Sequence, residues 1–447
     1  MVKSIIKKLT SSEIIKKLSG TAGVNFVGLF VGFISQTVLA RYLGTHEYGI
    51  FVYAFSWVML LSILGRFGFD NLIINRLPSY LKKKKYSEIK GLSYFSKLFS
   101  YLLSVVLGVL FFGTMYMLDL SNIVQSSYTF LIGFFFVLPL LIISYINQGF
   151  LVGLKQVVVA NIPIMIIRHV LLIAFIILCY YVFGSVTSLE AMLLNGLAFL
   201  VVAEISFRWV KDNFQFPFKT IKNEFRIKNW LVNSFPFLLY SGASFINRKV
   251  DILILGGLVS ATNVGIYNAA AKLVMIISVG SNITSLVSKP HISDFFAEGK
   301  ISKIESYSCK VAWANFSYSL AAFSCIVLFG EYFLLIFGNE FKRGYDVLMI
   351  FAIGYLIVST ISISGLILIM TKYEKIGSNI ELGITVFNIL LNIVLIPKYG
   401  AIGAAFATSF TLILRSFVAF LFVRSKFDIN PTVFNTQETR KLIKSLG

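Results

Sequence analysis

The chain has 447 residues, of which 57% are apolar and 15% aromatic, and its formal net charge is +20. This many apolar residues exclude an ordinary soluble globular domain, and apolar runs near the ~20 residues that span a bilayer recur along the whole sequence. We therefore predict a polytopic membrane protein. No soluble domain is expected, because the longest polar intervals, near 70–92, 208–232 and 425–447, are too short to bury a core of their own.

The N-terminal segment is the first feature along the chain. Between residues 4 and 20, isoleucines and leucines recur at helical spacing among lysines, a pattern typical of an amphipathic helix at a membrane interface. This segment does not have the pattern of a cleavable signal peptide. We expect residues 1–19 to lie on the cytoplasmic surface of the membrane.

Twelve apolar segments are long enough to cross a bilayer as helices. They cover residues 20–41, 49–68, 95–118, 128–152, 157–183, 189–210, 235–259, 265–288, 308–330, 346–370, 377–396 and 401–424. Their boundaries are set to within ~2–4 residues. Because a helix satisfies all of its backbone polar groups within one segment, we predict an all-α integral membrane protein with twelve transmembrane helices.

The positive charges between these segments predict the orientation of the chain. Most of the 40 Lys and Arg residues lie in alternate intervals that begin with the N-terminus. The other intervals hold only Arg41, Lys342, Arg343 and Lys398. Since basic loops stay in the cytoplasm, both termini are predicted to be cytoplasmic. The predicted topology thus explains most of the net positive charge, and no nucleic-acid partner is needed to account for it. The basic loops at 76–97 and 208–228 would also attract anionic membrane lipid.

Two stretches nearly half the chain apart resemble each other. YGIFVYAFSWVMLLS at Tyr48–Ser62 aligns with VGIYNAAAKLVMIIS at Val264–Ser278, with identical Gly, Ile, Ala, Val, Met and Ser at matching positions. Similarity between apolar helices also arises by chance, but each stretch falls on the second span of a six-span half. We therefore predict two six-helix lobes related by a pseudo-two-fold axis along the membrane normal, with a cavity between them, as in transporters.

This reading divides the chain into five parts. They are a cytoplasmic amphipathic segment at 1–19, an N-lobe at 20–210, a basic cytoplasmic linker at 211–234, a C-lobe at 235–424 and a cytoplasmic tail at 425–447. The two lobes carry all of the expected spans.

Three motifs resemble a known family. LARYLGTHEYGIF lies at Leu39–Phe51, FPFLLYSGASFINRKVDILILGGLVSATNVGIYNAAAKL at Phe235–Leu273, and LLNIVLIPKYGAIGAAFATSFT at Leu390–Thr411. Taken together, in this order and spacing, they are similar to the signatures of the polysaccharide and O-antigen flippases (Wzx-type) of the multidrug/oligosaccharidyl-lipid/polysaccharide (MOP) exporter superfamily. The resemblance covers nearly the whole chain.

The resemblance implies a two-lobed bundle that flips an undecaprenyl-diphosphate-linked oligosaccharide from the cytoplasmic to the outer leaflet of the bacterial plasma membrane by alternating access. Such transport serves the biosynthesis of surface polysaccharides such as the O-antigen of lipopolysaccharide. It implies no enzymatic activity, and it implies glycosyltransferases and a polysaccharide polymerase as partners. No cofactor or metal is expected, because the cysteines and histidines are scattered without the spacing of a metal site.

Charged residues inside the expected spans mark the candidate site. A charge near the bilayer centre costs several kcal/mol, so it is kept only where a charge partner, a water-filled cavity or a charged ligand compensates for that cost. Arg66 lies near a cytoplasmic end and is expected to reach water by snorkelling. The deeper cations are Arg168, Arg248, Lys249, Lys272 and Arg415. Arginine binds phosphate oxygens with paired hydrogen bonds and lysine is a mobile point charge, so these residues suit a diphosphate. Hydrogen bonding between helices is the alternative role of each cation.

Two acids are candidates for coupling or for charge balance. Asp251 lies three residues after Arg248, so the two side chains could simply neutralise each other on one helix face. Alternatively, Asp251 or Glu204 titrates or exchanges an ion, H+ or Na+, as the protein changes conformation. The membrane potential acting on the cationic interior is a further driving force that the sequence leaves open.

Other functions are weighed against the flippase. A cation-coupled multidrug exporter shares the fold, but acids rather than cations should then dominate the centre of the spans. A membrane polysaccharide polymerase or glycosyltransferase typically needs a large outer loop or clustered acids, and the longest outer interval here is near 331–345. A structural scaffold would explain neither the repeat nor the central charges. The flippase is therefore the leading hypothesis.

Overall fold

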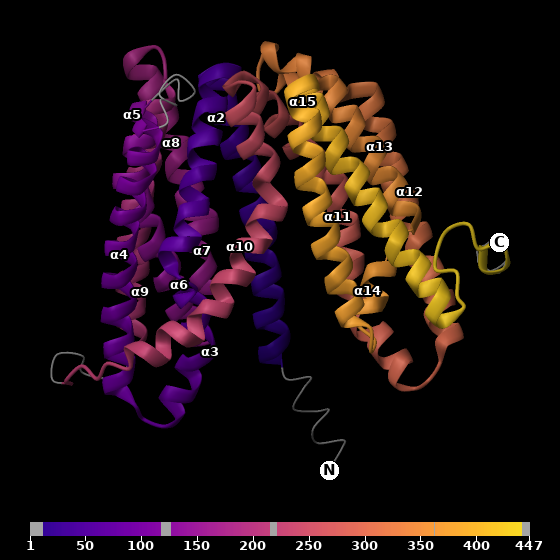
Figure 1. Cartoon of the computed structure of the whole chain (residues 1–447), viewed down its shortest axis with the longest axis horizontal. Coiled ribbons are helices and arrows are strands. Elements are labelled where there is room, and N and C mark those ends of the chain that lie inside the picture. The colour runs from indigo at the N-terminus through magenta and orange to yellow at the C-terminus, as the bar shows by residue number, and fades with distance from the viewer. Residues whose placement is uncertain (1–11, 118–126, 215–220, 362, 440–447) are drawn as a thin grey trace. The chain divides into compact units, whose positions relative to one another are not determined.

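The computed structural model describes residues 12–117, 127–214, 221–361 and 363–439, and every regular element in this part of the chain is a helix (Figure 1). The helices are α2 (Ser12–Arg66), α3 (Phe69–Lys82), α4 (Tyr86–Met117), α5 (Ser127–Ile132), η2 (Gly133–Val137), α6 (Leu138–Gly153), α7 (Val157–Ile162), η3 (Pro163–Ile167), α8 (Arg168–Phe183), α9 (Ser188–Asn213), α10 (Ile227–Leu258), α11 (Ala261–Ala297), α12 (Ile301–Leu335), η4 (Asn339–Gly344), α13 (Tyr345–Ile361), α14 (Ser364–Ile369) and α15 (Glu374–Phe427). Residues 1–11 of the expected amphipathic segment lie outside the described residues, as do 215–220 of the linker and 440–447 of the tail.

Nine helices in the described ranges are long and apolar enough to cross a membrane. This finding confirms the prediction of an all-helical, multi-pass membrane protein. The twelve spans and the symmetry of two lobes stay predictions. Helix α10 is not among the nine, because the polar and charged residues near Arg248 lower its hydropathy.

Two of the apolar helices are much longer than a bilayer requires and are broken by a glycine. Helix α2 has 55 residues and α15 has 54, whereas about 20 residues suffice to span the hydrocarbon core. Gly44 interrupts α2 with φ 74° and ψ 175°, and Gly400 interrupts α15 with φ 57° and ψ −132°. Only glycine adopts such backbone angles readily. Each long helix therefore consists of two helical segments joined at a glycine.

The break at Gly400 is also held by a neighbouring helix. The side-chain oxygen Oδ1 of Asn263, at the start of α11, accepts a hydrogen bond from the backbone N–H of Ala401 at 3.2 Å. A Cβ atom on Gly400 would lie 2.8 Å from that oxygen. The glycine therefore serves both the backbone conformation and the close approach of α11.

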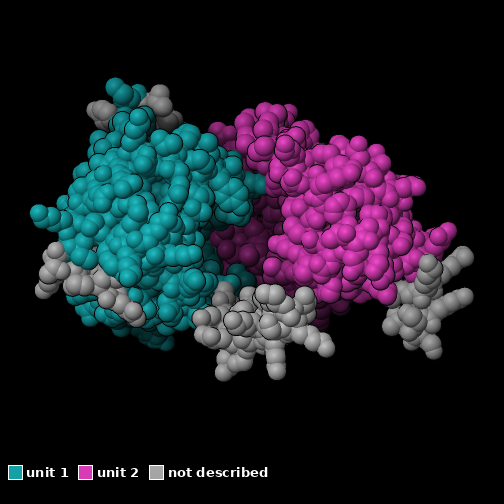
Figure 2. Space-filling view, turned by 90° about the horizontal axis from the view of Figure 1, so that it is seen from below, with its two compact units in different colours: residues 1–249 teal, residues 250–447 magenta. Residues whose placement is uncertain are grey.

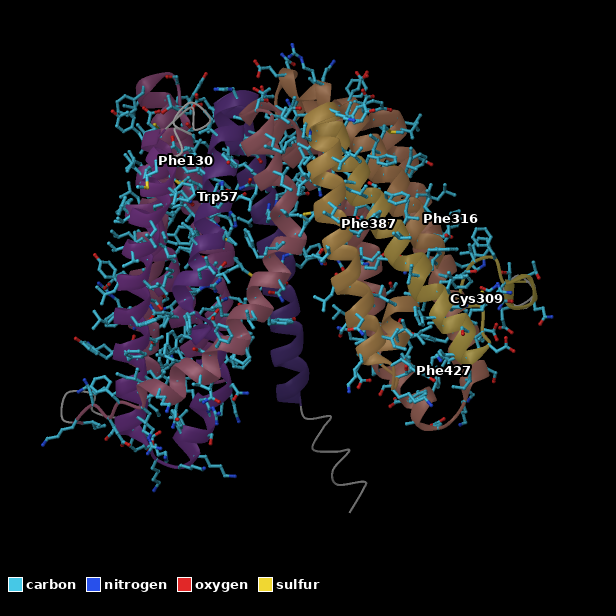
Figure 3. All side chains as sticks on the ribbon, viewed as in Figure 1. Trp57, Phe130, Cys309, Phe316, Phe387 and Phe427 are labelled. Atoms are coloured by element: carbon cyan, nitrogen blue, oxygen red, sulfur yellow. The ribbon has the colours of Figure 1, made fainter. Side chains whose placement is uncertain are left out.

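The chain divides into two compact units, residues 1–249 and 250–447, which Figure 2 colours separately. In unit 1, α6 packs against α3, α4 and α9, and in unit 2, α13 packs against α11, α12 and α15. Trp57 and Phe130 mark an aromatic cluster of unit 1 (Figure 3), in which the Phe111 ring lies 5.1 Å from Trp57 and 4.6 Å from Phe134. The boundary between the units falls inside α10.

The first half of α10 is fastened to α3 within unit 1. Arg76 donates to the side chain of Asn233 at 2.9 Å, and Trp230 donates to the Tyr80 hydroxyl at 3.3 Å. Gly68 permits the closest contact, because a Cβ atom there would lie 2.4 Å from the backbone oxygen of Ser234. These contacts make the N-terminal half of α10 a part of unit 1.

The chain that follows α15 folds back onto unit 2. The carboxylate of Glu305 on α12 accepts hydrogen bonds from the backbone of Asn430 at 3.0 Å and from the side chain of Asn435 at 2.8 Å. Phe427, at the end of α15 (Figure 3), packs with its ring centroid 5.4 Å from that of Tyr373. The described part of the C-terminal tail is thereby anchored on the helix bundle.

Candidate functional site

Arg168 is the most enclosed of the predicted cations. It begins α8 directly after the wide turn η3, where its backbone N–H donates to the oxygen of Pro163, and such π-turns are frequent at functional sites. Its side chain is only 8% exposed. The guanidinium lies 5.0 Å from the ring centre of Phe55 on α2 and 4.7 Å from that of Phe199 on α9. Three helices of unit 1 thus surround one positive charge.

The polar contacts of Arg168 leave hydrogen-bond donors without acceptors. Its Nε donates to Oδ1 of Asn195 on α9 at 3.1 Å. Within the described ranges, no carboxylate pairs with Arg168, and the buried Nδ2 of Asn195 has no acceptor. Cation–π contacts contribute ~0.5–2 kcal/mol, which is less than the several kcal/mol that burial of an unpaired ion costs. An anion at this point would supply the missing acceptors.

Arg66 is also buried in unit 1, but its charge is neutralised. Its NH1 lies 2.7 Å from the carboxylate of Asp70, and its Nε donates to the backbone oxygen of Ser62 at 3.1 Å. The guanidinium also lies 4.2 Å from the ring centre of Tyr145. The side chain does not snorkel, contrary to the sequence-based expectation. The turn between α2 and α3 brings Asp70 back toward the end of α2, and this supplies a partner inside the protein.

Asp251 is a buried acid on α10, at the start of unit 2. It is 9% exposed, it accepts a hydrogen bond from the hydroxyl of Tyr267 on α11, and it accepts another from the backbone N–H of Ile252 at 2.8 Å. Arg248, three residues earlier on α10, donates to the Ser244 hydroxyl at 2.7 Å and is exposed. Arg248 and Asp251 therefore each have a hydrogen-bond partner of their own, and the role of Asp251 in coupling or charge balance stays a prediction.

The remaining predicted residues differ in burial and in partners. Lys249 and Lys272 are partly buried on α10 and α11. Arg415 forms an ion pair at 3.3 Å with Glu381, which lies on the other side of the Gly400 break in α15. This pair reduces the surplus positive charge that the sequence assigned to the centre of the C-lobe.

Glu204 lies at the surface of unit 1. Its side chain is 53% exposed and pairs with Arg208, one turn later on α9, at 2.6 Å. A carboxylate in this setting is already balanced and accessible. Glu204 therefore differs from Asp251, which is buried and accepts a hydrogen bond from Tyr267.

A group of buried amides on α15 was missed by the sequence analysis. Asn388 donates to the Thr411 hydroxyl at 3.0 Å, and Asn392 donates to Asn388 at 3.0 Å. The Oδ1 atom of Asn392 is buried and has no hydrogen-bond donor. The available signal was two asparagines one helical turn apart in an apolar span, which is costly in lipid unless the amides have partners.

Comparison with known proteins identifies the family. A family model described as "Polysaccharide biosynthesis protein" matches residues 14–296. The chain belongs to this polysaccharide biosynthesis protein family. The resemblance inferred from the three sequence motifs is thereby confirmed.

A curated relative and two solved structures extend this finding. The chain is 24% identical over 252 residues to "Capsular polysaccharide biosynthesis protein CapF" from Staphylococcus aureus, a match that covers 55% of this chain and 63% of that protein. The match thus spans less than two thirds of the relative's length. An inward-facing multidrug resistance MATE family transporter of the MOP superfamily superposes with a TM-score of 0.72, at 14% identity, over 90% of this chain and 94% of the other. The lipid II flippase MurJ, in an inward closed conformation, superposes with a TM-score of 0.67, at 14% identity, over 90% and 87%.

The structural matches establish the fold of the chain, and the family match establishes its family. At 14% identity the two structural matches show that the chain has the MOP fold, and both a drug transporter and a lipid flippase share that fold. The family match connects the chain to polysaccharide biosynthesis. The residues of the candidate site must therefore distinguish between the two kinds of cargo.

Proposed function

We propose that the chain is a flippase that moves undecaprenyl-diphosphate-linked oligosaccharide units from the cytoplasmic to the outer leaflet of the bacterial plasma membrane by alternating access. The observation that carries this proposal is the buried donor group of Arg168 and Asn195, which has cationic and amide donors without an acid. Phosphate oxygens are the acceptors that a guanidinium binds best. Membership of the polysaccharide biosynthesis family supports the same cargo.

The cations would hold the charged part of the cargo while the rest of it stays in its preferred solvent. Arg168, Arg248, Lys249, Lys272 and Arg415 would contact the diphosphate during the cycle. The polyprenyl tail would remain among lipid chains, and the sugars would occupy a hydrated path. The protein would then catalyse no covalent reaction, so it is not an enzyme. Glycosyltransferases that build the unit and a polymerase that joins the flipped units would be its functional partners.

The helix pattern supports a twelve-span topology for this flippase. Counting α2 and α15 as two spans each, because each is broken by a glycine, and adding α10 brings the nine apolar helices to twelve. An even number of spans places the two termini on one side, and the distribution of Lys and Arg favours the cytoplasm. The same count supports our proposal of two six-span lobes.

Asp251 is the residue that we assign to coupling. A carboxylate buried in unit 2 and held by the Tyr267 hydroxyl would release or take up H+ or Na+ when its surroundings open to water. The membrane potential would act on the same cycle, at ~2.3 kcal/mol per charge per 100 mV. Glu204 is left with a charge-balancing role toward Arg208.

A multidrug exporter is the second candidate, because the MATE transporter superposes with the higher TM-score of the two structures. Such a protein would need acids to bind cationic drugs. One of the two buried arginines of unit 1, Arg168, instead has no acid to balance it among the described residues. This difference favours the lipid-linked glycan as cargo.

Transport in proteoliposomes tests the proposal. Purified full-length protein would be assayed with a fluorescent undecaprenyl-diphosphate oligosaccharide and, separately, with a cationic dye. We expect movement of the lipid-linked glycan but not of the dye, and a decrease of at least tenfold for Arg248→Ala at equal protein levels. Lys398→Ala removes an exposed lysine on α15 and serves as the matched control. Movement of the dye without movement of the glycan would instead identify a drug exporter.

A further inference from the structure

Lys97 on α4 lies in an unusual position for a lysine in an apolar helix. Its Nζ is 5.0 Å from the ring centre of Phe207 on α9 and 6.0 Å from that of Phe150 on α6. Phe150 lies in the last turn of α6 and Phe207 in the last two turns of α9. At 1.5 Å per residue, the backbones of these two phenylalanines are within ~10 Å of the ends of their helices, and lipid headgroups meet acyl chains near the ends of helices that span a membrane.

The protein itself supplies no anion to this lysine. Within the described part of unit 1, the Lys97 amine has no ion pair and no hydrogen bond, only the two aromatic rings. Glu204 lies one turn before Phe207 on α9, but its carboxylate is held by Arg208 at 2.6 Å. A lysine that merely snorkelled would extend its amine into water, whereas this amine lies over two rings. Its charge therefore remains available to a ligand.

The surface beside Lys97 fits the apolar part of a lipid. Along α4, Tyr94 is 56% exposed and Leu98 is 43% exposed, and on α9 Phe207 is 47% exposed. Helix α6 packs against both α4 and α9, and it therefore lies beneath the surface between these two helices. One turn beyond Phe207, the exposed Lys211 adds a second positive charge at the end of α9.

We propose that Lys97, with the exposed ring of Phe207, forms a binding site for the phosphate of an anionic phospholipid, whose acyl chains lie along Tyr94 and Leu98, while the fully buried Phe150 supports the lysine from below. Basic sites between membrane helices recognise lipid headgroups in this way. Two nearby lysines favour a lipid with a net negative charge over a zwitterionic one. The aromatic and aliphatic neighbours offer little to the hydroxyl groups of a glycan, so the occupant is a membrane phospholipid rather than the cargo. This inference does not depend on the proposed transport function.

Native mass spectrometry of the full-length protein with phosphatidylglycerol and phosphatidylcholine tests this site. We expect the wild type to retain phosphatidylglycerol in preference to phosphatidylcholine. Lys97→Gln should reduce the retained phosphatidylglycerol at least fivefold, while Lys97→Arg, which keeps the charge, should retain it. Lys375→Gln removes an exposed lysine of unit 2 and should have no effect. A melting temperature for each variant checks that the fold is preserved.

Three results would overturn the inference. The first is equal retention of phosphatidylglycerol by the wild type and Lys97→Gln. The second is equal retention of the two phospholipids by the wild type. The third is displacement of phosphatidylglycerol by a much lower concentration of undecaprenyl phosphate, which would assign the site to the carrier lipid of the cargo.

Discussion

Arg66 and Arg168 are both buried in unit 1 and both lie against aromatic rings, yet their surroundings differ in one respect. Arg66 has a carboxylate at 2.7 Å, whereas Arg168 has the neutral side chain of Asn195 at 3.1 Å. The first guanidinium is a satisfied structural group that ties α2 to α3. The second keeps its charge without a counter-ion among the described residues, which is what a group reserved for an anionic ligand requires.

The difference between the two arginines assigns a role in stability to Arg66 and a role in transport to Arg168. A buried charge with its partner contributes to the fold mainly because losing either member is costly. A buried charge without a partner costs stability, so its presence needs a functional reason. Substitutions around Arg66 should therefore change unfolding, and substitutions around Arg168 should change transport.

The largest effect is expected for Asp70→Ala, because it leaves Arg66 buried and unpaired. Breaking one member of a buried pair typically costs about 3–5 kcal/mol, so the melting temperature in detergent should fall steeply. Glu204→Ala is the matched control, since it breaks the exposed pair with Arg208 and should cost ~0–1 kcal/mol. Similar melting temperatures for the two variants would show that the Arg66 pair is not structural.

The turn that brings Asp70 to Arg66 should be the next most sensitive. Gly68 has φ 75°, and a Cβ atom there would meet the backbone oxygen of Ser234 at 2.4 Å. We expect Gly68→Ala to cost at least about 2 kcal/mol, from the left-handed conformation and from the clash. Gly113→Ala on α4, where a Cβ atom meets nothing within 4 Å, should not lower the free energy of unfolding. Thermal unfolding of the two variants side by side measures the difference.

A single substitution should make Arg168 resemble Arg66. Asn195→Asp places a carboxylate where Oδ1 now accepts from Arg168, so the charge becomes paired without a cavity. We expect the melting temperature to be maintained while the transport of a lipid-linked glycan falls about tenfold, which is ~1.4 kcal/mol in the barrier. Transport at the wild-type rate would mean that the Arg168 charge is not used.

Local spacing explains which of these features the sequence could predict. Apolar runs predicted the membrane helices, and the motifs around Gly44 and Gly400 predicted the family. The ion pair between Arg66 and Asp70 could have been predicted, because the two residues are four positions apart. It was missed because Gly68 ends the helix between them, so the i, i+4 spacing of a continuous helix did not apply. Asn195 lies on a different helix from Arg168, so no periodicity could connect the two.

The same limit applies to unit 2. Glu381 and Arg415 lie on opposite sides of the break in α15, and only the folded chain brings them to 3.3 Å. Asp251 hydrogen-bonds to Tyr267 on the next helix, and Arg248, at the end of unit 1, hydrogen-bonds to Ser244, and the spacing of the two charged residues predicted neither contact. Spacing along the sequence therefore did not predict the partners of these charged residues, because the partners are set by how separate helices pack.

If Arg168 binds the charged group of the cargo, as we propose, the affinity of Arg168→Met for an undecaprenyl-diphosphate-linked oligosaccharide should fall. The substitution replaces a buried unpaired charge by a shorter apolar side chain, and the removed cost of burying that charge should offset the lost hydrogen bond to Asn195. We expect a dissociation constant at least tenfold larger than that of the wild type, with an unchanged or higher melting temperature. An unchanged dissociation constant in the folded variant would contradict this proposal.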